Sequence, residues 1–156
     1  MIALERIGRD ARARMAHIRV APEQEPFCGS IASHFDADEP SCDFHAVLSD
    51  GVPVGFFKID RAYADRLPEA RADEIGLRGM MIDRTAQGRG TGKAAIAALR
   101  AHLRRHYPDA AACVLTVNQA NPAARAVYLA GGFVDTGALY HGGRIGPQHI
   151  LRLTLR

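Results

Sequence analysis

Tryptophan is absent from this sequence of 156 residues, and all aromatic residues together make up 6% of it. Proteins that hold single-stranded nucleic acid stack the bases on aromatic side chains, so few such stacking surfaces are available here. The lysines and arginines form no run of five or more. The net charge of +3 favours a polyanionic small molecule as readily as nucleic acid. No nucleic-acid partner is expected.

Cysteine is also scarce. The three residues Cys28, Cys42 and Cys113 are odd in number and have neither CxxC nor CxxH spacing. This pattern gives no sign of a disulfide framework or of a zinc site. We therefore expect reduced, mostly buried thiols and no bound metal.

Long apolar runs are missing as well. No run approaches the ~20 residues that span a bilayer, and the charged first fifteen residues lack the apolar core of a signal peptide. Hydrophobic residues at 47% and charged residues at 24% are typical of a soluble globular protein. We expect one cytoplasmic domain over residues 1–156 without a membrane partner, in which residues 1–16 form an N-terminal extension, either a short helix or a frayed arm.

The order of apolar runs and turn signals predicts alternating strands and helices. Asp50-Gly51 separates two β-rich runs and predicts a hairpin. Residues 62–73 are expected to form a loop with a helical turn. Strands are expected at 17–20, 44–48, 52–59, 74–82, 112–117, 133–140 and 149–155, and helices at 29–35, 93–106 and from 121 to about 130.

Residues 87–92, with the sequence Gln-Gly-Arg-Gly-Thr-Gly, lie between a predicted strand and a predicted helix. Glycine has no Cβ, so backbone N–H groups in such a loop can approach an anion closely. The N-terminus of the following helix also favours negative charge. The segment predicts a phosphorylated ligand.

Two common phosphate-binding motifs do not fit this loop. A dinucleotide fingerprint needs G-x-G-x-x-G and an acidic residue about 20 residues further on, but the spacing here is G-x-G-x-G and the next strand ends in Thr116-Val117-Asn118. A Walker loop needs one more residue before Lys93, and Ala94 replaces the hydroxyl that holds magnesium. Hydride transfer and nucleotide hydrolysis are both disfavoured.

The same loop resembles the pyrophosphate-binding motif of the GNAT superfamily of acetyl-CoA-dependent N-acetyltransferases, with Gln87, Gly90 and Gly92 at the defining positions. Residues 121–133, Asn-Pro-Ala-Ala-Arg-Ala-Val-Tyr-Leu-Ala-Gly-Gly-Phe, are similar to a second segment of that family. The resemblance is strong over about residues 74–137. It implies an α+β fold with three α/β/α layers: a mixed, mostly antiparallel sheet of six to seven strands, whose fourth and fifth strands form a parallel, splayed pair, with helices on both faces.

The resemblance implies acetyl-CoA as the co-substrate and no metal. Backbone N–H groups of the loop would hold the pyrophosphate, and the free edge of the fourth strand would bind the pantetheine amides. For Arg89 and Lys93 a solvated surface role is an equal alternative, and Asn121 also fits a helix cap. The implied coenzyme-binding residues are Met80, Met81, Ile82, Gln87, Gly88, Arg89, Gly90, Thr91, Gly92, Lys93, Asn121 and Tyr128.

For catalysis the resemblance favours Tyr128 as the acid that protonates the leaving thiolate, against the alternative of a core tyrosine. Glu74 is the nearest candidate for a general base, although it lies at the far end of its strand and equally suits a solvated strand start. His45 is a rival base, against a packing role. Cys113 is interpreted as a structural thiol.

The acceptor implied by the resemblance is a primary amine, expected to be a small molecule such as a polyamine, an amino acid or an aminoglycoside. Its pocket is expected from residues 29–43, 62–73 and 140–148. The acids Asp36, Asp38, Glu39 and Asp43 are expected to form a solvated loop, with attraction of a cationic amine as the alternative. A protein N-terminal or lysine acetyltransferase, a non-catalytic acyl-CoA sensor and a homodimer remain open.

Overall fold

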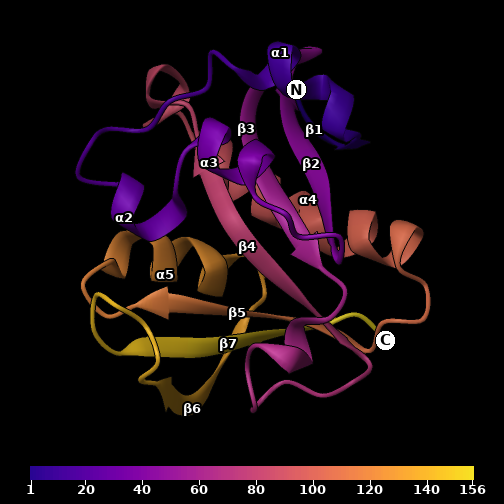
Figure 1. Ribbon diagram of the computed structural model, residues 1–156, viewed down its shortest axis with the longest axis vertical. Coiled ribbons are helices and arrows are strands. Elements are labelled where there is room, and N and C mark those ends of the chain that lie inside the picture. The colour runs from indigo at the N-terminus through magenta and orange to yellow at the C-terminus, as the bar shows by residue number, and fades with distance from the viewer.

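The computed structural model describes all 156 residues and contains one seven-stranded sheet, ordered β1-β2-β3-β4-β5-β7-β6 (Figure 1). Neighbouring strands are antiparallel except β4 and β5, which are parallel. The strands are β1 (Ile2–Ile7), β2 (Cys42–Ser49), β3 (Val52–Asp60), β4 (Glu74–Ile82), β5 (Ala112–Asn118), β6 (Val134–Tyr140) and β7 (Gln148–Thr154).

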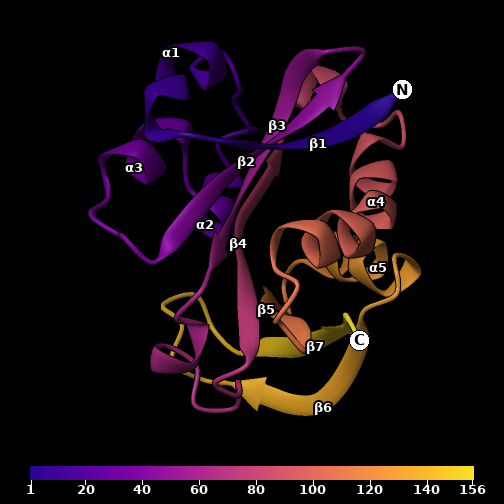
Figure 2. The same cartoon turned by 90° about the vertical axis from the view of Figure 1, so that its right-hand side faces the viewer.

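Helices cover both faces of the sheet. The short helices α1 (Arg12–Met15), α2 (Glu25–Cys28) and α3 (Ile31–Asp36) lie on one face, and α4 (Thr91–His106) and α5 (Pro122–Ala130) lie on the other (Figure 2). None of these helices is long and apolar enough to cross a membrane. The predicted three-layer α/β/α architecture with a mixed sheet is confirmed.

The predicted hairpin joins β2 to β3. Asp50 and Gly51 both adopt positive φ, 47° and 83°, as a two-residue turn of the tight hairpin type requires. Gly51 is free of the Cβ that makes such a backbone unfavourable. The hairpin places β2 and β3 in antiparallel register from Cys42↔Asp60 onward, so its two strands form the centre of one half of the sheet.

The first residues differ from the expectation of a helix or frayed arm. Residues 2–7 form the edge strand β1, which pairs with β2 from Ile2↔Ser49 to Ile7↔Phe44. Only Ile7 of β1 is buried, and the charged residues Glu5 and Arg6 on this edge strand hide its period-two pattern. Residues 17–20, expected as a strand, have no regular structure. Within the predicted extension 1–16, residues 2–7 are therefore part of the sheet, and the expected short helix is present only at Arg12–Met15, after a 3₁₀ turn at Arg9–Ala11.

Side chains alternate between the two faces of β3 and so divide the core. Phe57 and Ile59 pack with residues of α4 in the larger cluster, whereas Phe56 packs with residues of α1 and α3 in a second one. By the same alternation, Lys58 and Asp60 lie on the face that α1 and α3 cover. This face is polar near the end of β3.

The parallel pair β4/β5 is short. Only Glu74, Ile75 and Gly76 pair with β5, whereas β5 continues to pair with β7 as far as Asn118. Beyond Gly76 the two strands diverge, as Figure 1 shows. The splayed pair is confirmed, and it leaves two strand edges that face each other without hydrogen bonds between them.

Candidate active site

A cleft of about 1130 Å³ occupies the splay between β4 and β5. The 87–93 loop lies at the end where β4 and β5 have diverged, and Leu77 and Arg78, next to the paired part of β4, line the other end; α2, α5 and all three segments predicted for the acceptor also contribute residues. Clefts of this size at a break in the sheet are typical of ligand sites. The splay of the two strands thus creates a site large enough for a coenzyme and a second substrate.

The 87–93 loop presents unpaired backbone donors. None of the N–H groups from Gly88 to Lys93 has a backbone acceptor within the chain; the first bond of the α4 turn is from Ala94 N to Gly90 O. Gly88 and Gly90 both adopt φ of 76°, the left-handed conformation found in turns whose successive N–H groups bind anions. The row ends on the N-terminus of α4, whose dipole favours an anion.

Side chains around this loop have separate roles. Gln87 Nε2 donates to Ile82 O at 2.8 Å and braces the loop against the end of β4. Thr91 Oγ1 donates to Ala86 O, so this residue offers only its N–H. Arg89 donates to Thr85 O at 2.7 Å and does not line the cleft, which argues against its predicted contact with phosphate. Lys93 does line the cleft.

A β-bulge interrupts β4 beside the cleft. The β3–β4 register shifts between Phe56↔Met81 and Lys58↔Arg78, so β4 carries one extra residue there. Gly79 has φ of 64°, and a Cβ on it would lie 2.7 Å from His34 Cε1. Only glycine fits this position.

The three β4 residues predicted to bind coenzyme, Met80, Met81 and Ile82, all line the cleft. The Met81 side chain is buried among the α1 and α3 residues on the opposite face, so it can offer mainly backbone groups. A bulge leaves its extra residue outside the ladder. Met81 and Ile82 still pair with Phe56 and Gly55 of β3 on one edge, so the backbone groups that this stretch offers to the cleft are those on its other edge, from which β5 has diverged.

Tyr128 projects from α5 into the wall of the cleft. Its ring meets Phe133 edge-on with centroids 5.6 Å apart. Burial raises the pKa of its phenol, and nearby thiols raise it further, while no hydrogen bond within the chain acts on it. Tyr128 is therefore a protonated, unpartnered donor at neutral pH.

Asn121 begins α5 and also lines the cleft. Its Oδ1 accepts a hydrogen bond from Ala124 N at 3.4 Å, the contact of an N-cap. Pro122 follows at the first helical position, where its missing N–H costs nothing. Asn121 thus orients the helix that carries Tyr128, and its Nδ2 stays available to a ligand.

Glu74 does not suit the predicted role of general base. It lies where β4 and β5 are still paired and does not line the cleft. Arg152 donates to it at 2.6 and 3.1 Å, and Arg71 N donates at 2.8 Å. Burial would raise the pKa of this carboxyl, but these donors outweigh burial and lower it. Glu74 is an anchored structural ion.

The rival base His45 also lies outside the cleft. It is fully buried on the α4 side of β2, with Nδ1 2.9 Å from His102 Nε2 and Nε2 2.9 Å from Tyr107 Oη. Tyr107 in turn donates to Asp43. Asp43 therefore belongs to this cluster. Cys113 is buried in the larger core cluster, in agreement with its interpretation as a structural thiol.

The four acids of the 36–43 segment, for which attraction of a cationic amine was the alternative to a solvated loop, do not line the cleft. Asp36 pairs with Arg12 at the surface, and Asp43 faces the other side of the sheet, beside Tyr107. Glu39 is half-buried and pairs with Lys58 at 2.5 Å and with Arg78 at 2.8 Å. None of these acids is placed to attract an amine in the cleft; Asp36 fits the favoured solvated loop, whereas Glu39 is held in ion pairs.

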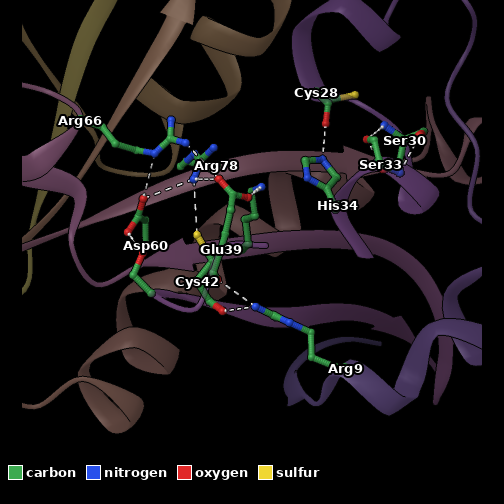
Figure 3. A network of polar contacts seen from close by, with 12 residues as sticks. Arg9, Cys28, Ser30, Ser33, His34, Glu39, Cys42, Asp60, Arg66 and Arg78 are labelled. Carbon is green, nitrogen blue, oxygen red and sulfur yellow. Dashed lines mark hydrogen bonds and ion pairs between the residues drawn. The ribbon is translucent and has the colours of Figure 1, made fainter. Parts of the chain in front are cut away.

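His34 is a cleft residue that the sequence did not single out. It projects from α3 next to the bulge, stacks on Phe56 with centroids 5.2 Å apart, and contacts Cys28 O through Nε2 at 2.6 Å (Figure 3). Because a carbonyl can only accept, Nε2 carries the proton and Nδ1 holds a lone pair. Burial lowers the pKa of His34, and the charges of Lys58 and Arg78 lower it further. The sequence did not predict this place for His34 because α3 and β4 come together only in the tertiary fold.

No group of three or more His, Cys, Asp or Glu side chains is arranged to hold a metal ion.

Residues 11–133, most of the chain, match the model of the acetyltransferase (GNAT) family. An uncharacterized N-acetyltransferase of Bacillus subtilis (strain 168), YbbJ, is 33% identical over 103 residues. That match covers 65% of this chain and 61% of the relative, so the chain spans less than two thirds of the relative's length.

Solved structures share the fold. A structure of the aminoglycoside acetyltransferase AAC(6')-Ib in complex with coenzyme A has a TM-score of 0.77 at 17% identity and covers 99% of this chain and 95% of that one. A spermidine N-acetyltransferase SpeG chimera from Vibrio cholerae and hSSAT has a TM-score of 0.69 at 16% identity, with 99% and 95% coverage. From the loop, the splayed strands and the family match together, the chain belongs to the GNAT acetyltransferase family.

Proposed function

We propose that this protein transfers an acetyl group from acetyl-CoA directly to a primary amine, with both substrates bound at once. The observation that carries the proposal is the row of unpaired N–H groups from Gly88 to Lys93 at one end of a cleft that Tyr128 and His34 line. A pyrophosphate fits such a row without a metal ion. Pantetheine would then follow the free edge of β4 toward the bulge.

Acetyl-CoA supplies a thioester carbonyl for the amine to attack, so a C–N bond forms as the C–S bond breaks. Backbone N–H groups near Met81 are suited to hold the negative charge that develops on the carbonyl oxygen. Tyr128 gives its proton to the departing sulfur, since its raised pKa keeps it protonated. Holding both reactants in one cleft supplies much of the remaining rate.

His34 is our candidate for the base that takes the proton from the attacking amine. Its Nδ1 lone pair is set by the bond from Nε2 to Cys28 O, and its lowered pKa keeps the ring neutral at pH 7. The bulge residue Gly79 lies directly against this ring. We propose His34 in place of Glu74, whose two oxygens are held by Arg152 and Arg71 N.

Calorimetry and bisubstrate kinetics test this function. We expect coenzyme A to bind the free protein, and initial rates of thiol release to depend on both substrates with intersecting double-reciprocal lines. Parallel lines would point to an acetyl-enzyme and contradict direct attack. Coenzyme A binding without thiol release for any amine would favour the acyl-CoA sensor instead.

A further inference from the structure

The acceptor end of the cleft carries basic side chains and no acid. The cleft is lined there by Lys58, Arg66, Arg78 and Arg144. Glu23 is the one carboxylate that lines any part of the cleft. It is exposed beside Gln24, whose amide contacts Gln87 at the opposite, loop end.

Three of these cations form ion pairs with the carboxylates of Glu39 and Asp60, and Figure 3 shows Arg66 and Arg78 beside these two acids. Glu39 pairs with all three, at 2.5 Å to Lys58, 3.0 Å to Arg66 and 2.8 Å to Arg78. Asp60 pairs with Arg66 and Arg78 at 3.5 and 3.3 Å and is 2% exposed. Three cations against two carboxylates leave one excess positive charge, and because neither acid lines the cleft, the group presents its cationic side chains there.

The cluster is fixed by the sheet. Lys58 and Arg78 are register partners on β3 and β4, on the face that α1 and α3 cover, and Arg66 follows the 3₁₀ turn Tyr63–Asp65. Burial would raise the pKa of Glu39, but its bonds to Lys58 and Arg78 outweigh burial and lower it to about 2. The carboxylate therefore stays ionised and holds the two cations in place. Arg144, exposed on the β6–β7 turn, has no carboxylate partner.

Position along β4 puts this charge beyond the reacting carbonyl. The strand runs from Arg78 through the bulge at Gly79 to Ile82, and the loop follows it. An acetyl group carried on pantetheine from the loop would reach the bulge first. A molecule that brings its amine to the bulge from the other end must place its remaining atoms among the cations.

The geometry points to an acceptor amine that also carries an anionic group, a carboxylate or a phosphate, bound by Arg66 and Arg78. This inference rests on the proposed function and names its substrate class. Guanidinium groups match the two oxygens of such anions. Like charge rejects polycations and lowers the pKa of the bound ammonium, so the amine loses its proton more readily.

Specificity constants for four classes of acceptor test the inference. Amino acids are the acceptors with a carboxylate, and amino-sugar phosphates are the acceptors with a phosphate. Spermidine and kanamycin are the polycationic acceptors. We expect at least one class of anionic acceptor to have a kcat/KM at least tenfold above that of both polycations. The anionic class with the higher kcat/KM identifies the anion that the cleft binds. Higher kcat/KM for spermidine or kanamycin would overturn the inference alone. Turnover of no amine despite coenzyme A binding would overturn the proposed function together with it.

Variants of the cleft arginines test which side chains bind the anionic group of the acceptor. Arg66→Gln, at a side chain that is 52% exposed, is expected to raise KM for the anionic acceptor about tenfold and leave KM for acetyl-CoA unchanged. Arg144→Gln is a second variant at an exposed turn, expected to act in the same direction. Arg104→Gln, exposed on α4 outside the cleft, is the control with no effect. An unchanged KM for the anionic acceptor in both cleft variants would contradict the proposal.

Discussion

Tyr128 and Tyr107 both have a phenol whose pKa is raised mainly by burial, yet their surroundings differ. Tyr107 donates to Asp43 at 2.8 Å and contacts His45, so its hydroxyl proton already takes part in a hydrogen bond within the protein. Tyr128 faces the cleft and has no partner in the chain. Of the two, only Tyr128 can give its proton to a ligand.

Replacing Tyr128 by Phe should lower kcat about 100-fold, since it removes the acid that protonates the thiolate. The affinity for coenzyme A should stay within about twofold, because the ring and its packing on Phe133 remain. Thiol release measures the first and calorimetry the second. Tyr107→Phe is the matched control, expected to lower stability and leave kcat unchanged. An equal kcat for Tyr128→Phe and wild type would remove Tyr128 from the mechanism.

His34→Gln tests the base. Glutamine can still donate to Cys28 O but has no basic nitrogen, so we expect kcat to fall about 100-fold. In the wild type the logarithm of kcat should rise with pH through a pKa below 6.5, because protonated His34 cannot accept the amine's proton. That limb should vanish in the variant. A wild-type limb that persists in His34→Gln would assign it to another group.

At the scale of single residues, the sequence predicted which positions carry functional side chains better than it predicted what those side chains contact. Tyr128, Asn121 and the loop glycines were found because they fall in a compact segment pattern. The role of Glu74 depends on Arg152, 78 residues away, and sequence spacing gives no sign of that contact. His34 was missed for the same reason, because its place beside Gly79 exists only once α3 packs on β4.

At the scale of elements, the loop before α4 combines glycines with different requirements. Gly90 adopts φ of 76° in open space, so it is needed for its backbone conformation and not for room. Gly92 has an ordinary φ in the first turn of α4, and a Cβ added there would lie 3.8 Å from Ile82 Cγ1, an ordinary contact distance. Substitution of each glycine by alanine should therefore affect stability differently.

Gly90→Ala should lower the free energy of unfolding by about 1–2 kcal/mol, because a Cβ is disfavoured at positive φ. Gly92→Ala should leave it unchanged or raise it by up to ~1 kcal/mol, because alanine favours a helix. Urea denaturation of both variants measures the difference. Equal stabilities would show that the left-handed turn at Gly90 is not a requirement of the fold.

Most elements were predictable because their patterns are local. β4 was predicted with the bounds it has, and the Asp50-Gly51 turn fixed the hairpin. β1 was missed because an edge strand with charged residues at Glu5 and Arg6 lacks a clear apolar alternation. The bulge at Gly79 was also missed, although a glycine inside a strand often marks one; the size of the register shift depends on the pairing with β3, which the sequence does not show.

At the scale of the whole molecule, a buried histidine cluster links stability to pH. Burial and neighbouring charge lower the pKa of His45 to about 3 and that of His102 to about 4. Both are neutral in the folded state and would have pKa values near 6.5 when unfolded. The folded state therefore gains stability above pH 6.5 and loses it as pH falls from 6.5 toward 4.

We expect the urea midpoint to fall between pH 7 and pH 5, a window above the range in which the paired carboxylates titrate. His102→Gln should reduce this dependence, because one histidine fewer takes up a proton on unfolding. His17→Gln, at an exposed histidine, should not change it. A midpoint that is constant over this window would show that the cluster is not neutral in the folded protein.

The whole molecule also sets what the cleft can accept, because β3, β4 and the loop after Arg66 meet only in the fold. The central claim for this protein is acetyl transfer to an amine in that cleft. The most direct test measures, in one reaction, the thiol released from acetyl-CoA and the acetylated amine formed, with an anionic amine as acceptor. We predict equal amounts of the two products. Thiol release without an acetylated amine would contradict the claim.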